Sequence, residues 1–312
     1  MTVRIINADV IDGLMQLPDE SVHCVVTSPP YFGLRDYGHK GQIGLEPTPD
    51  AYVAKMVEVF RQVRRVLHKD GTCWLNLGDS YAGGGGHSPN SPSSKYSKSG
   101  LYGMALKEGG IKPNGAVKAK DLIGIPWRVA FALQADGWWL RQDIIWSKPN
   151  PMPESVIDRC TKAHEYIFLL TKDSRYFYDA EEIKEPSIYE GDRKTGLGST
   201  KEFDPKRQAN KLRGERIVPE HRNKRSVWEV AAQPFPEAHF ATFPPALIEP
   251  CVRAGCPEGG TVLDPFGGSG TTGLVADRLK RNAILIELNP EYAAMAERRI
   301  RGDSPLFAEV AP

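Results

Sequence analysis

The chain has 312 residues, of which 40 % are hydrophobic and 25 % are charged, as in ordinary globular proteins. No apolar run approaches the roughly 18 residues that a membrane helix requires. The first residues alternate like a strand and lack the pattern of a secretory signal, so we expect a cytoplasmic protein. Because 40 Lys and Arg nearly balance 39 Asp and Glu, the protein could bind a nucleic acid only through a local basic patch. Five scattered cysteines without a Cys-x-x-Cys pair argue against a zinc site and read as packing residues.

The first third of the chain alternates between predicted strands and a predicted helix. Residues 21–28 form a short apolar run that stops at Pro29 and Pro30, as expected of a buried strand that runs into a loop. Apolar residues recur at helical spacing over residues 50–67, and residues 72–77 read as another buried strand. Strand, helix and strand in this order are typical of a parallel sheet.

The middle of the chain changes composition twice. Residues 83–115 are rich in Gly, Ser and Lys and poor in large apolar residues, which predicts a mobile loop. A helix is predicted over residues 121–135, and strands over residues 138–146 and 165–170. Between residues 192 and 225, eleven basic residues face five acidic ones, an excess of six positive charges. Such a run is either a solvated loop or a nucleic-acid contact.

The C-terminal quarter reads as a strand–helix–strand–helix unit that follows a helix at residues 244–254. Its predicted elements are a strand at 261–264, a helix at 271–279, a strand at 283–288 and a helix at 290–300.

A glycine-rich turn joins the first strand and helix of this unit, with the sequence Asp-Pro-Phe-Gly-Gly-Ser-Gly-Thr-Thr over residues 264–272. Glycines let the backbone approach a ligand, and a helix N-terminus offers free N–H donors. Glu287 ends the next strand, where a carboxylate can hold a ribose diol. The turn lacks the Gly-Lys-Ser/Thr of a P-loop, and a bulky side chain, Phe266, occupies it, which argues against a dinucleotide cofactor. The sequence therefore predicts a nucleotide-type site of another kind.

The tetrapeptide Ser28, Pro29, Pro30 and Tyr31 is the second motif. Two prolines fix an extended backbone and remove two N–H donors, so their carbonyls can face a ligand. Ser28 adds a hydroxyl and Tyr31 adds an aromatic face. Hydrogen bonds from a planar amine to the Ser28 oxygen and the Pro29 carbonyl would favour a pyramidal nitrogen and expose its lone pair. The motif predicts chemistry on an exocyclic amine, with Tyr31 stacked on the base.

These two motifs, in this order, resemble the β-class amino-DNA methyltransferases, whose catalytic motif precedes the target-recognition region and whose S-adenosylmethionine (SAM) motif lies near the C-terminus. The resemblance also takes in Asn-Ala-Asp-Val at 7–10, Trp-Ser-Lys-Pro-Asn-Pro at 146–151, His-Glu-Tyr-Ile-Phe at 164–168 and His-Phe-Ala-Thr-Phe-Pro at 239–244. It covers most of the chain outside the Gly/Ser loop and the basic segment.

The resemblance implies a set of site residues, with SAM as the cofactor and no metal. The catalytic residues would be Ser28, Pro29, Pro30 and Tyr31. Glu287 would bind the ribose and Asp9 would face the adenine. The full set of candidate cofactor-binding residues is Asp9, Asp264, Phe266, Gly267, Gly268, Ser269, Gly270, Glu287 and Asn289. The candidate DNA-binding residues are Arg35, Lys148, Asn150, Arg207, Lys211 and Arg213.

The resemblance also implies an α/β, Rossmann-like SAM-dependent methyltransferase fold with a mostly parallel sheet, a circularly permuted motif order and an inserted target-recognition region. Residues 1–174 and 238–312 would form the catalytic and SAM-binding domain, and residues 175–237 the basic target-recognition region. The expected partner is double-stranded DNA, from which the target base must flip out because its amine is engaged in pairing. The resemblance is also compatible with a homodimer and with a cognate restriction endonuclease as a partner in a restriction-modification system.

The acceptor nitrogen stays open between two bases. Serine at the first motif position often accompanies N4-cytosine enzymes and aspartate usually accompanies N6-adenine enzymes, but serine-type adenine enzymes also exist. N4 of cytosine is therefore favoured over N6 of adenine. An RNA or small-molecule N-methyltransferase is a more distant alternative, and the basic segment with its interspersed aromatic residues argues against a small-molecule substrate.

Overall fold

The computed structural model describes residues 1–34, 38, 39, 41–82, 117–187, 220–233, 242–303 and 309–311. The chain divides into two compact units, Met1–Asp179 with Ser226–Pro312, and Ala180–Arg225. The larger unit contains the main sheet and its helices, and the smaller unit contains a short antiparallel strand pair.

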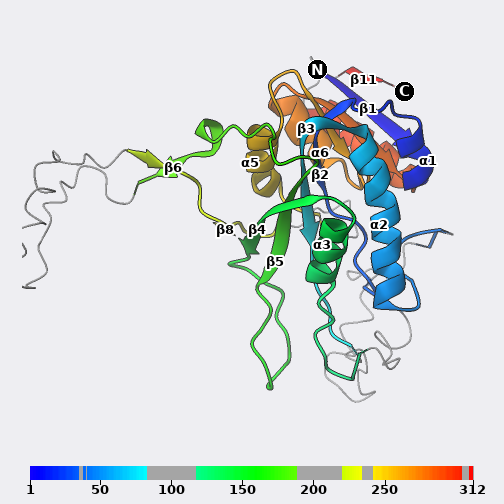
Figure 1. Cartoon of the computed structure of the whole chain (residues 1–312), viewed down its shortest axis with the longest axis vertical. Helices are drawn as coiled ribbons and strands as arrows, with labels where there is room; N and C mark the ends of the chain where they lie inside the picture. Colours follow the sequence, from blue (N-terminus) through cyan, green and yellow to red (C-terminus); the bar gives the residue numbers. More distant parts are fainter. Residues whose placement is uncertain are drawn as a thin grey trace, which may run out of the picture. The chain divides into compact units, whose positions relative to one another are not determined.

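One mixed sheet forms the centre of the larger unit (Figure 1), with the described strands in the order β11-β1-β10-β9-β2-β3-β5-β4-β8. Neighbouring strands are parallel except around β5, which is antiparallel to both β3 and β4. The predicted mostly parallel α/β sheet is thus confirmed. The strands are β1 (Thr2–Asn7), β2 (Val22–Thr27), β3 (Leu67–Leu77), β4 (Trp139–Ser147), β5 (His164–Thr171), β8 (Val227–Glu229), β9 (Thr261–Asp264), β10 (Asn282–Glu287) and β11 (Glu309–Ala311).

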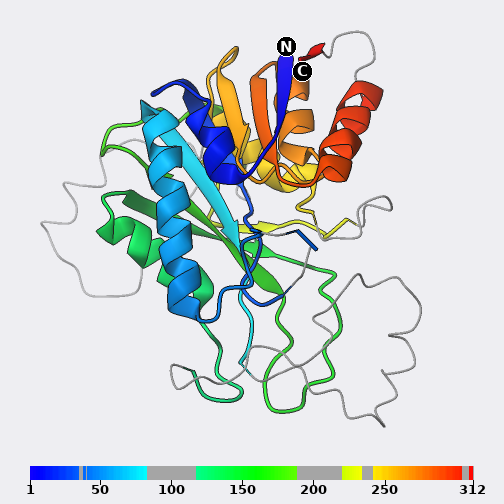
Figure 2. The same cartoon turned by 90° about the vertical axis from the view of Figure 1, so that its right-hand side faces the viewer.

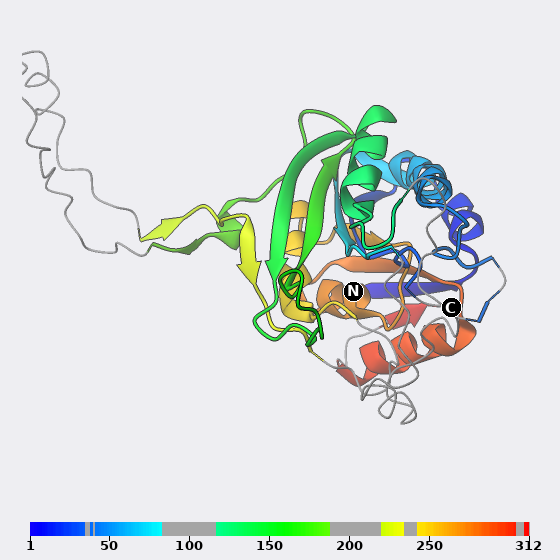
Figure 3. The same ribbon diagram turned by 90° about the horizontal axis from the view of Figure 1, so that it is seen from below.

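Helices cover both faces of this sheet, as the view from below shows (Figure 3). On one face α2 packs against α1 and α3, and on the other α6 packs against α5 and α7. Their bounds are α1 (Val10–Met15), α2 (Pro49–Val66), α3 (Ile125–Ala135), α5 (Pro245–Gly255), α6 (Thr271–Arg278) and α7 (Pro290–Asp303). Across the described residues, no helix combines the length and apolarity needed to span a bilayer.

Helix α2, which runs along one face of the sheet (Figure 2), illustrates how the sequence specifies these elements. Thr48 caps its N-terminus by accepting a backbone N–H at 3.1 Å. Pro49 occupies the first turn, where its missing N–H has no partner to lose. Tyr52 and Met56 belong to an apolar stripe that is fully buried against the sheet. The helix predicted from periodicity is confirmed.

Among the elements that local patterns did not predict are α1, β8 and β11. In addition, β3 begins at Leu67, earlier than the predicted start at Thr72. Leu67 pairs with Val22, and an irregularity separates this pair from the pair formed by Cys24 and Thr72. Such short or irregular pairings depend on the neighbouring strand and leave no periodic signal in the sequence.

Strands β9 and β2 lie side by side, and the chain leaves them in opposite directions across the sheet. It runs from β2 through α2 to β3, and from β9 through α6 to β10. Open α/β sheets bind their ligands beyond the carboxyl ends of two strands at which the chain diverges in this way. The tetrapeptide follows β2 and the glycine-rich turn follows β9, so both motifs lie at this position.

The smaller unit is described at residues 180–187 and 220–225. It contains a short 3-10 helix, η2 (Glu181–Ile183), and the antiparallel strands β6 (Glu185–Pro186) and β7 (His221–Arg222). Glu185 Oε1 accepts a hydrogen bond from Arg222 (2.8 Å), which joins the two strands, and another from Arg225 (2.5 Å) beyond β7.

Candidate active site

The predicted catalytic tetrapeptide lies at the carboxyl end of β2. The prolines end the strand because they carry no N–H for further pairing. Pro29 is buried, whereas Ser28 and Tyr31 keep part of their surface accessible. The Tyr52 hydroxyl on α2 donates to the Pro30 carbonyl at 2.9 Å. Helix α2 therefore holds the turn while the two side chains proposed to act on the base remain within reach of a ligand.

The Tyr31 hydroxyl connects the tetrapeptide to β3 and β5. It lies 2.6 Å from Glu165 Oε2 and 3.2 Å from Asn76 Oδ1, and Ser28 Oγ donates to it at 3.3 Å. Desolvation and the Glu165 carboxylate raise the pKa of Tyr31 well above its usual value, so the phenol stays neutral. A Cβ at Gly78 would come within 2.5 Å of the Tyr31 ring, so a larger residue at this position would displace the ring.

Lys148, a predicted DNA-binding residue, belongs to the same cluster. Its Nζ forms an ion pair with Glu165 Oε1 and lies 4.2 Å from the centroid of the Trp146 ring. Asn150, the other candidate in this stretch, exchanges two hydrogen bonds with the Ala232 backbone, at 3.0 and 2.9 Å. The ammonium group is thus paired, and the Asn150 amide anchors a neighbouring backbone segment.

The glycine-rich turn between β9 and α6 needs its glycines for its own geometry. Gly268 and Gly270 have φ angles of +51° and +79°, a left-handed conformation that other residues rarely adopt. A Cβ at Gly270 would also lie 2.7 Å from Ala296 Cβ on α7. The Gly267 N–H donates to the Ile286 carbonyl at 2.8 Å, which ties the turn to β10.

Asp264 lies beneath this turn and is 1 % exposed. Its carboxylate accepts hydrogen bonds from the hydroxyls of Thr27 (2.6 Å) and Thr272 (2.7 Å) and from the Phe266 N–H (3.1 Å). Burial raises the pKa of Asp264 to about 6. Because its carboxylate is buried, Asp264 would affect a bound ligand only by fixing the conformation of the turn. It also links the turn to Thr27, the residue before the catalytic serine.

Glu287 and Asp9 lie at neighbouring strand ends, because β1 pairs with β10 so that Asn7 stands opposite Glu287. Glu287 accepts the N–H groups of Gly268 and Asn289, both at 2.8 Å. Burial raises the pKa of Glu287 despite these bonds. Asp9 and Asn289 each accept a backbone N–H of the helix that follows, at 2.9 and 2.8 Å. The candidate ribose and adenine residues are thereby brought together beside the turn.

Arg299 on α7 is a residue of this region that sequence reasoning missed. Its Nη1 donates to the carbonyl and hydroxyl oxygens of Ser269 (3.1 and 3.0 Å) and to Thr271 Oγ1 (2.9 Å). Ser269 is only 6 % exposed. The guanidinium thus fixes the start of α6, and no local motif marks an arginine that acts from another helix.

Glu165, Asn76 and Gly78 were also absent from the predicted site. Glu165 lies within the segment 164–168 that carried part of the resemblance. Asn76 is a polar residue within the otherwise apolar stretch of residues 73–77, which is a signal that could have identified it, because buried polar side chains need a partner. The fit of Gly78 to a tyrosine ring has no signal in the local sequence.

Four candidate DNA-binding residues, Arg35, Arg207, Lys211 and Arg213, lie outside the described residues, as does the predicted mobile loop at 83–115. In the part of the chain that is described, no group of three or more His, Cys, Asp or Glu side chains could hold a metal ion.

Methylation at C5 of cytosine would require a nucleophilic cysteine. The sequence contains one Pro-Cys pair, Pro250 and Cys251, and this pair lies inside α5. Cys251 is fully buried there. A residue in this position cannot reach a base at the carboxyl edge of the sheet.

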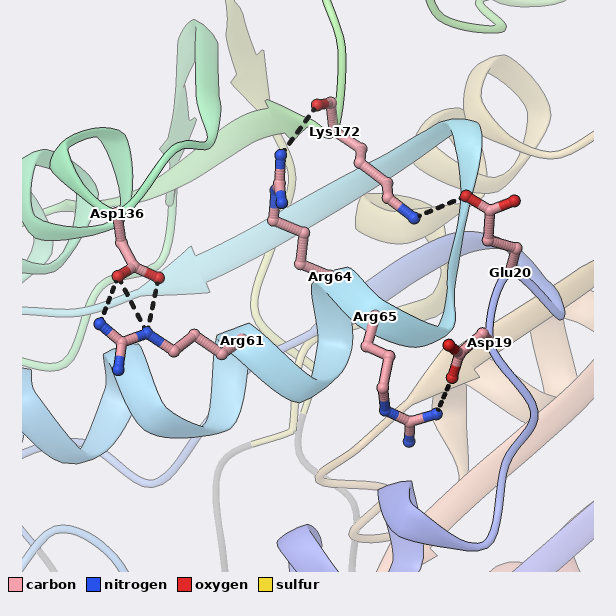
Figure 4. Close-up of a pocket in the computed structure, with 7 residues that line it drawn as sticks. All are labelled: Asp19, Glu20, Arg61, Arg64, Arg65, Asp136 and Lys172. Carbon is pink, nitrogen blue, oxygen red and sulfur yellow. Dashed lines mark hydrogen bonds and ion pairs between the residues drawn. The ribbon is translucent and has the colours of Figure 1, made fainter.

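A pocket of about 710 Å³ lies at the opposite edge, near the amino end of β2 (Figure 4). It is lined by Asp19, Glu20, Arg61, Arg64, Arg65, Asp136 and Lys172. Three of its cations face carboxylates: Arg61 with Asp136, Arg65 with Asp19 and Lys172 with Glu20, at 2.6, 2.5 and 2.9 Å. This largely self-neutralised cluster joins the end of α2 to its surroundings, away from the tetrapeptide.

The family model for N6/N4 DNA methylases matches residues 22–298. The chain belongs to this family. The methylase is 48 % identical over 297 residues to the Type II methyltransferase M.SmaI of Serratia marcescens, covering 95 % of the chain and 90 % of that protein. It is 45 % identical over 303 residues to the Type II methyltransferase M.XycI of Xanthomonas campestris pv. cyanopsidis, covering 97 % and 89 %. The family predicted from the two motifs is confirmed, and the protein is a DNA methyltransferase.

Solved structures agree with the fold of the methylase. The cytosine-N4-specific PvuII DNA methyltransferase aligns with a TM-score of 0.62 at 20 % identity, covering 96 % of the chain and 87 % of that structure. TTHA0409 from Thermus thermophilus, in complex with SAM, aligns with a TM-score of 0.60 at 24 % identity, covering 99 % and 100 %. At these identities the likeness establishes the fold alone.

Proposed function

We propose that this methyltransferase transfers the methyl group of SAM to N4 of cytosine at a specific site in double-stranded DNA, with N6 of adenine as the alternative acceptor. The observation that carries the proposal is the placement of Ser28 and the glycine-rich turn at the carboxyl ends of adjacent strands, coupled by the bond between Thr27 and Asp264. Serine at the first motif position favours cytosine.

The residues around the turn fit SAM. The Glu287 carboxylate is partly exposed, and each of its oxygens has a second lone pair with which to accept a ribose hydroxyl. Asp9 lies beside it for the adenine, and the partly exposed Phe266 ring follows Asp264 in the turn. When bound, SAM supplies an electrophilic methyl group on a positively charged sulfur. The solved neighbour TTHA0409 carries this cofactor.

The tetrapeptide would activate the amine. An exocyclic amine is conjugated with its ring and is a weak nucleophile until its nitrogen becomes pyramidal. We assign Ser28 Oγ and the Pro29 carbonyl as acceptors of its two N–H groups, because the Pro30 carbonyl is already bonded by Tyr52. The Tyr31 ring would stack on the flipped base. The nitrogen lone pair would form the bond to the methyl carbon as the carbon–sulfur bond breaks, leaving S-adenosylhomocysteine, and the nitrogen would release one proton to solvent.

Residues 1–174 and 238–312 would act as the catalytic domain, and residues 175–237 as the target-recognition region. Within the latter, Arg207, Lys211 and Arg213 would hold phosphates, together with Arg35 from the catalytic domain. Binding through phosphates should weaken steeply as the salt concentration rises. Salt-independent binding would contradict this assignment.

The relatives named Type II methyltransferases support a role in a restriction-modification system. We propose that the enzyme modifies cytoplasmic DNA at the site that a cognate endonuclease cuts. A homodimer is the oligomeric state to be tested.

The deciding experiment incubates the enzyme with SAM and unmethylated genomic DNA, digests the DNA to nucleosides and identifies the products by mass spectrometry. Ser28→Ala and Tyr31→Ala should abolish the product while SAM still binds. Ser21→Ala, at the amino end of β2, is the matched control and should leave it unchanged. N4-methylcytosine from the wild type would support the proposal, N6-methyladenine would reverse the choice of base, and no methylated nucleoside would refute it.

A further inference from the structure

A chain of hydrogen bonds runs from the proposed catalytic serine to a carboxylate. Ser28 Oγ lies 3.3 Å from Tyr31 Oη, and Tyr31 Oη lies 2.6 Å from Glu165 Oε2. Three separate segments contribute: the turn after β2 carries Ser28 and Tyr31, β5 carries Glu165, and β3 carries Asn76. β3 lies between β2 and β5 in the sheet and supplies Asn76, whose Nδ2 donates to Glu165 Oε2 at 3.2 Å.

The Glu165 carboxylate determines the direction of the hydrogen bonds that link it to Tyr31 and Ser28. An ionised carboxylate can only accept hydrogen bonds, and a phenol has a single hydrogen to donate. The Tyr31 hydrogen goes to Glu165 at 2.6 Å in preference to Asn76 Oδ1 at 3.2 Å. Tyr31 Oη is then an acceptor for Ser28, whose hydroxyl hydrogen points to Tyr31. The lone pairs of Ser28 Oγ are left for the ligand side.

The surroundings hold the Glu165 carboxylate in place as an acceptor. Lys148 Nζ pairs with its other oxygen, and the two side chains are 20 % and 16 % exposed. Lys148 is in turn held over the Trp146 ring. The Asn76 amide, fixed by a bond of 3.0 Å to the Tyr166 carbonyl, presents an N–H to the carboxylate. The bonds to Glu165 are charge-assisted and partly shielded from water, so the direction of the hydrogen bonds between Glu165, Tyr31 and Ser28 is strongly set.

We propose that Glu165 is a positioning residue that makes Ser28 a hydrogen-bond acceptor and so selects a base with an amino group over one with a carbonyl oxygen at the reacting position. This inference rests on the proposed function. A cytosine or adenine amine donates to the Ser28 oxygen. A carbonyl oxygen at the same place meets another acceptor, and two buried acceptors without a hydrogen between them repel each other.

Glu165→Gln tests the inference because it changes the direction of these hydrogen bonds while the side chain keeps nearly the same size. The glutamine oxygen can still accept from Lys148, and its amide nitrogen then donates to Tyr31 Oη. The Tyr31 hydrogen is released from Glu165 and can turn to Ser28 Oγ, which reverses the bond between the two hydroxyls. Ser28 can then donate its own hydrogen to a ligand as well as accept from one. The variant should therefore tolerate a carbonyl oxygen that the wild type rejects.

The experiment compares two kinds of unmethylated duplex that contain the site on which the enzyme acts. One carries the normal target base, and in the other uracil replaces the target cytosine, or hypoxanthine replaces the target adenine. Dissociation constants of both duplexes are measured for the full-length wild type and for E165Q, with a SAM analogue that lacks the transferable methyl group. For each protein, the dissociation constant of the altered duplex is divided by that of the normal duplex. The effect of the altered base pair on flipping is common to both proteins, so it cancels when their two ratios are compared. The ratio should fall by roughly fivefold or more in E165Q, since a mismatched buried hydrogen bond costs about 1–3 kcal/mol.

Two further variants separate this role from a merely structural one. Glu154→Gln removes a carboxylate that pairs with Arg159 in the segment after β4, and it should keep the wild-type ratio. Tyr31→Phe breaks the chain but keeps the ring, so it should lose the discrimination as E165Q does; it decides the question if E165Q does not fold. A folded E165Q with the wild-type ratio, or an equal change in E154Q, overturns the inference alone. Absence of methylation by the wild type would refute the proposed function as well.

Discussion

The buried Asp264 carboxyl provides a quantitative test of how the glycine-rich turn is held. Its oxygens receive hydrogen bonds from two threonine hydroxyls and one backbone N–H, yet burial raises the pKa to about 6 from a reference value of 3.8. The folded protein therefore binds this proton more tightly than the unfolded chain does. Stability gained from the group must appear as the pH falls through 6 and must be lost as the pH rises.

The size of the effect follows from the two pKa values. With values of about 6 in the folded state and 3.8 in the unfolded state, proton linkage adds about 1.4 kcal/mol to the free energy of unfolding between pH 8 and pH 5. Asp264→Asn keeps the size of the side chain and can bond to both threonine hydroxyls, which rotate to suit it. The variant has no charge to bury, so it lacks this pH dependence.

Urea unfolding of the wild type and D264N, followed by tryptophan fluorescence at pH 5, 6, 7 and 8, measures the difference directly. Relative to D264N, the wild type should gain about 1.4 kcal/mol in stability on going from pH 8 to pH 5. Other titrating groups are common to both proteins and cancel. Asp12→Asn, on the exposed side of α1, is the control and should follow the wild type. A difference between wild type and D264N that stays constant with pH would refute the reasoning.

Three other substitutions probe the site and its support. Gly78→Ala would place a Cβ 2.5 Å from the Tyr31 ring and should lower the single-turnover rate of methyl transfer by about 100-fold, with SAM affinity unchanged; an unchanged rate would show that the ring position is not critical. Arg299→Met removes three hydrogen bonds at the start of α6 and should weaken SAM binding in calorimetry by on the order of tenfold. Equal affinity would exclude this support. Thr72→Val leaves the buried Trp74 N–H without its acceptor (3.1 Å) and should lower the free energy of unfolding by about 1–3 kcal/mol, whereas a loss of activity at full stability would contradict a purely structural role.

Local sequence patterns were enough to specify most elements and both motifs. Helical spacing over residues 50–67 was sufficient for α2, and the proline pair was sufficient to end β2, because both signals depend only on neighbouring residues. The glycine-rich turn, with Glu287 on the next strand, was likewise read from spacing alone. The order of the motifs then predicted the family, which the comparisons confirm.

Which side chains meet was set by the arrangement of the strands. Glu165 bonds to Tyr31 across 134 residues of sequence, and Asp264 bonds to Thr27 across 237. Both contacts follow from the strand order β9-β2-β3-β5 and from the reversed direction of β5, which brings its first residues to the carboxyl ends of β2 and β3. Local patterns encode which face of a strand is apolar, but the partner and direction of a strand depend on how the whole sheet buries its surface. The catalytic motif was therefore legible in the sequence, while the groups that orient it were fixed by the packing of distant strands.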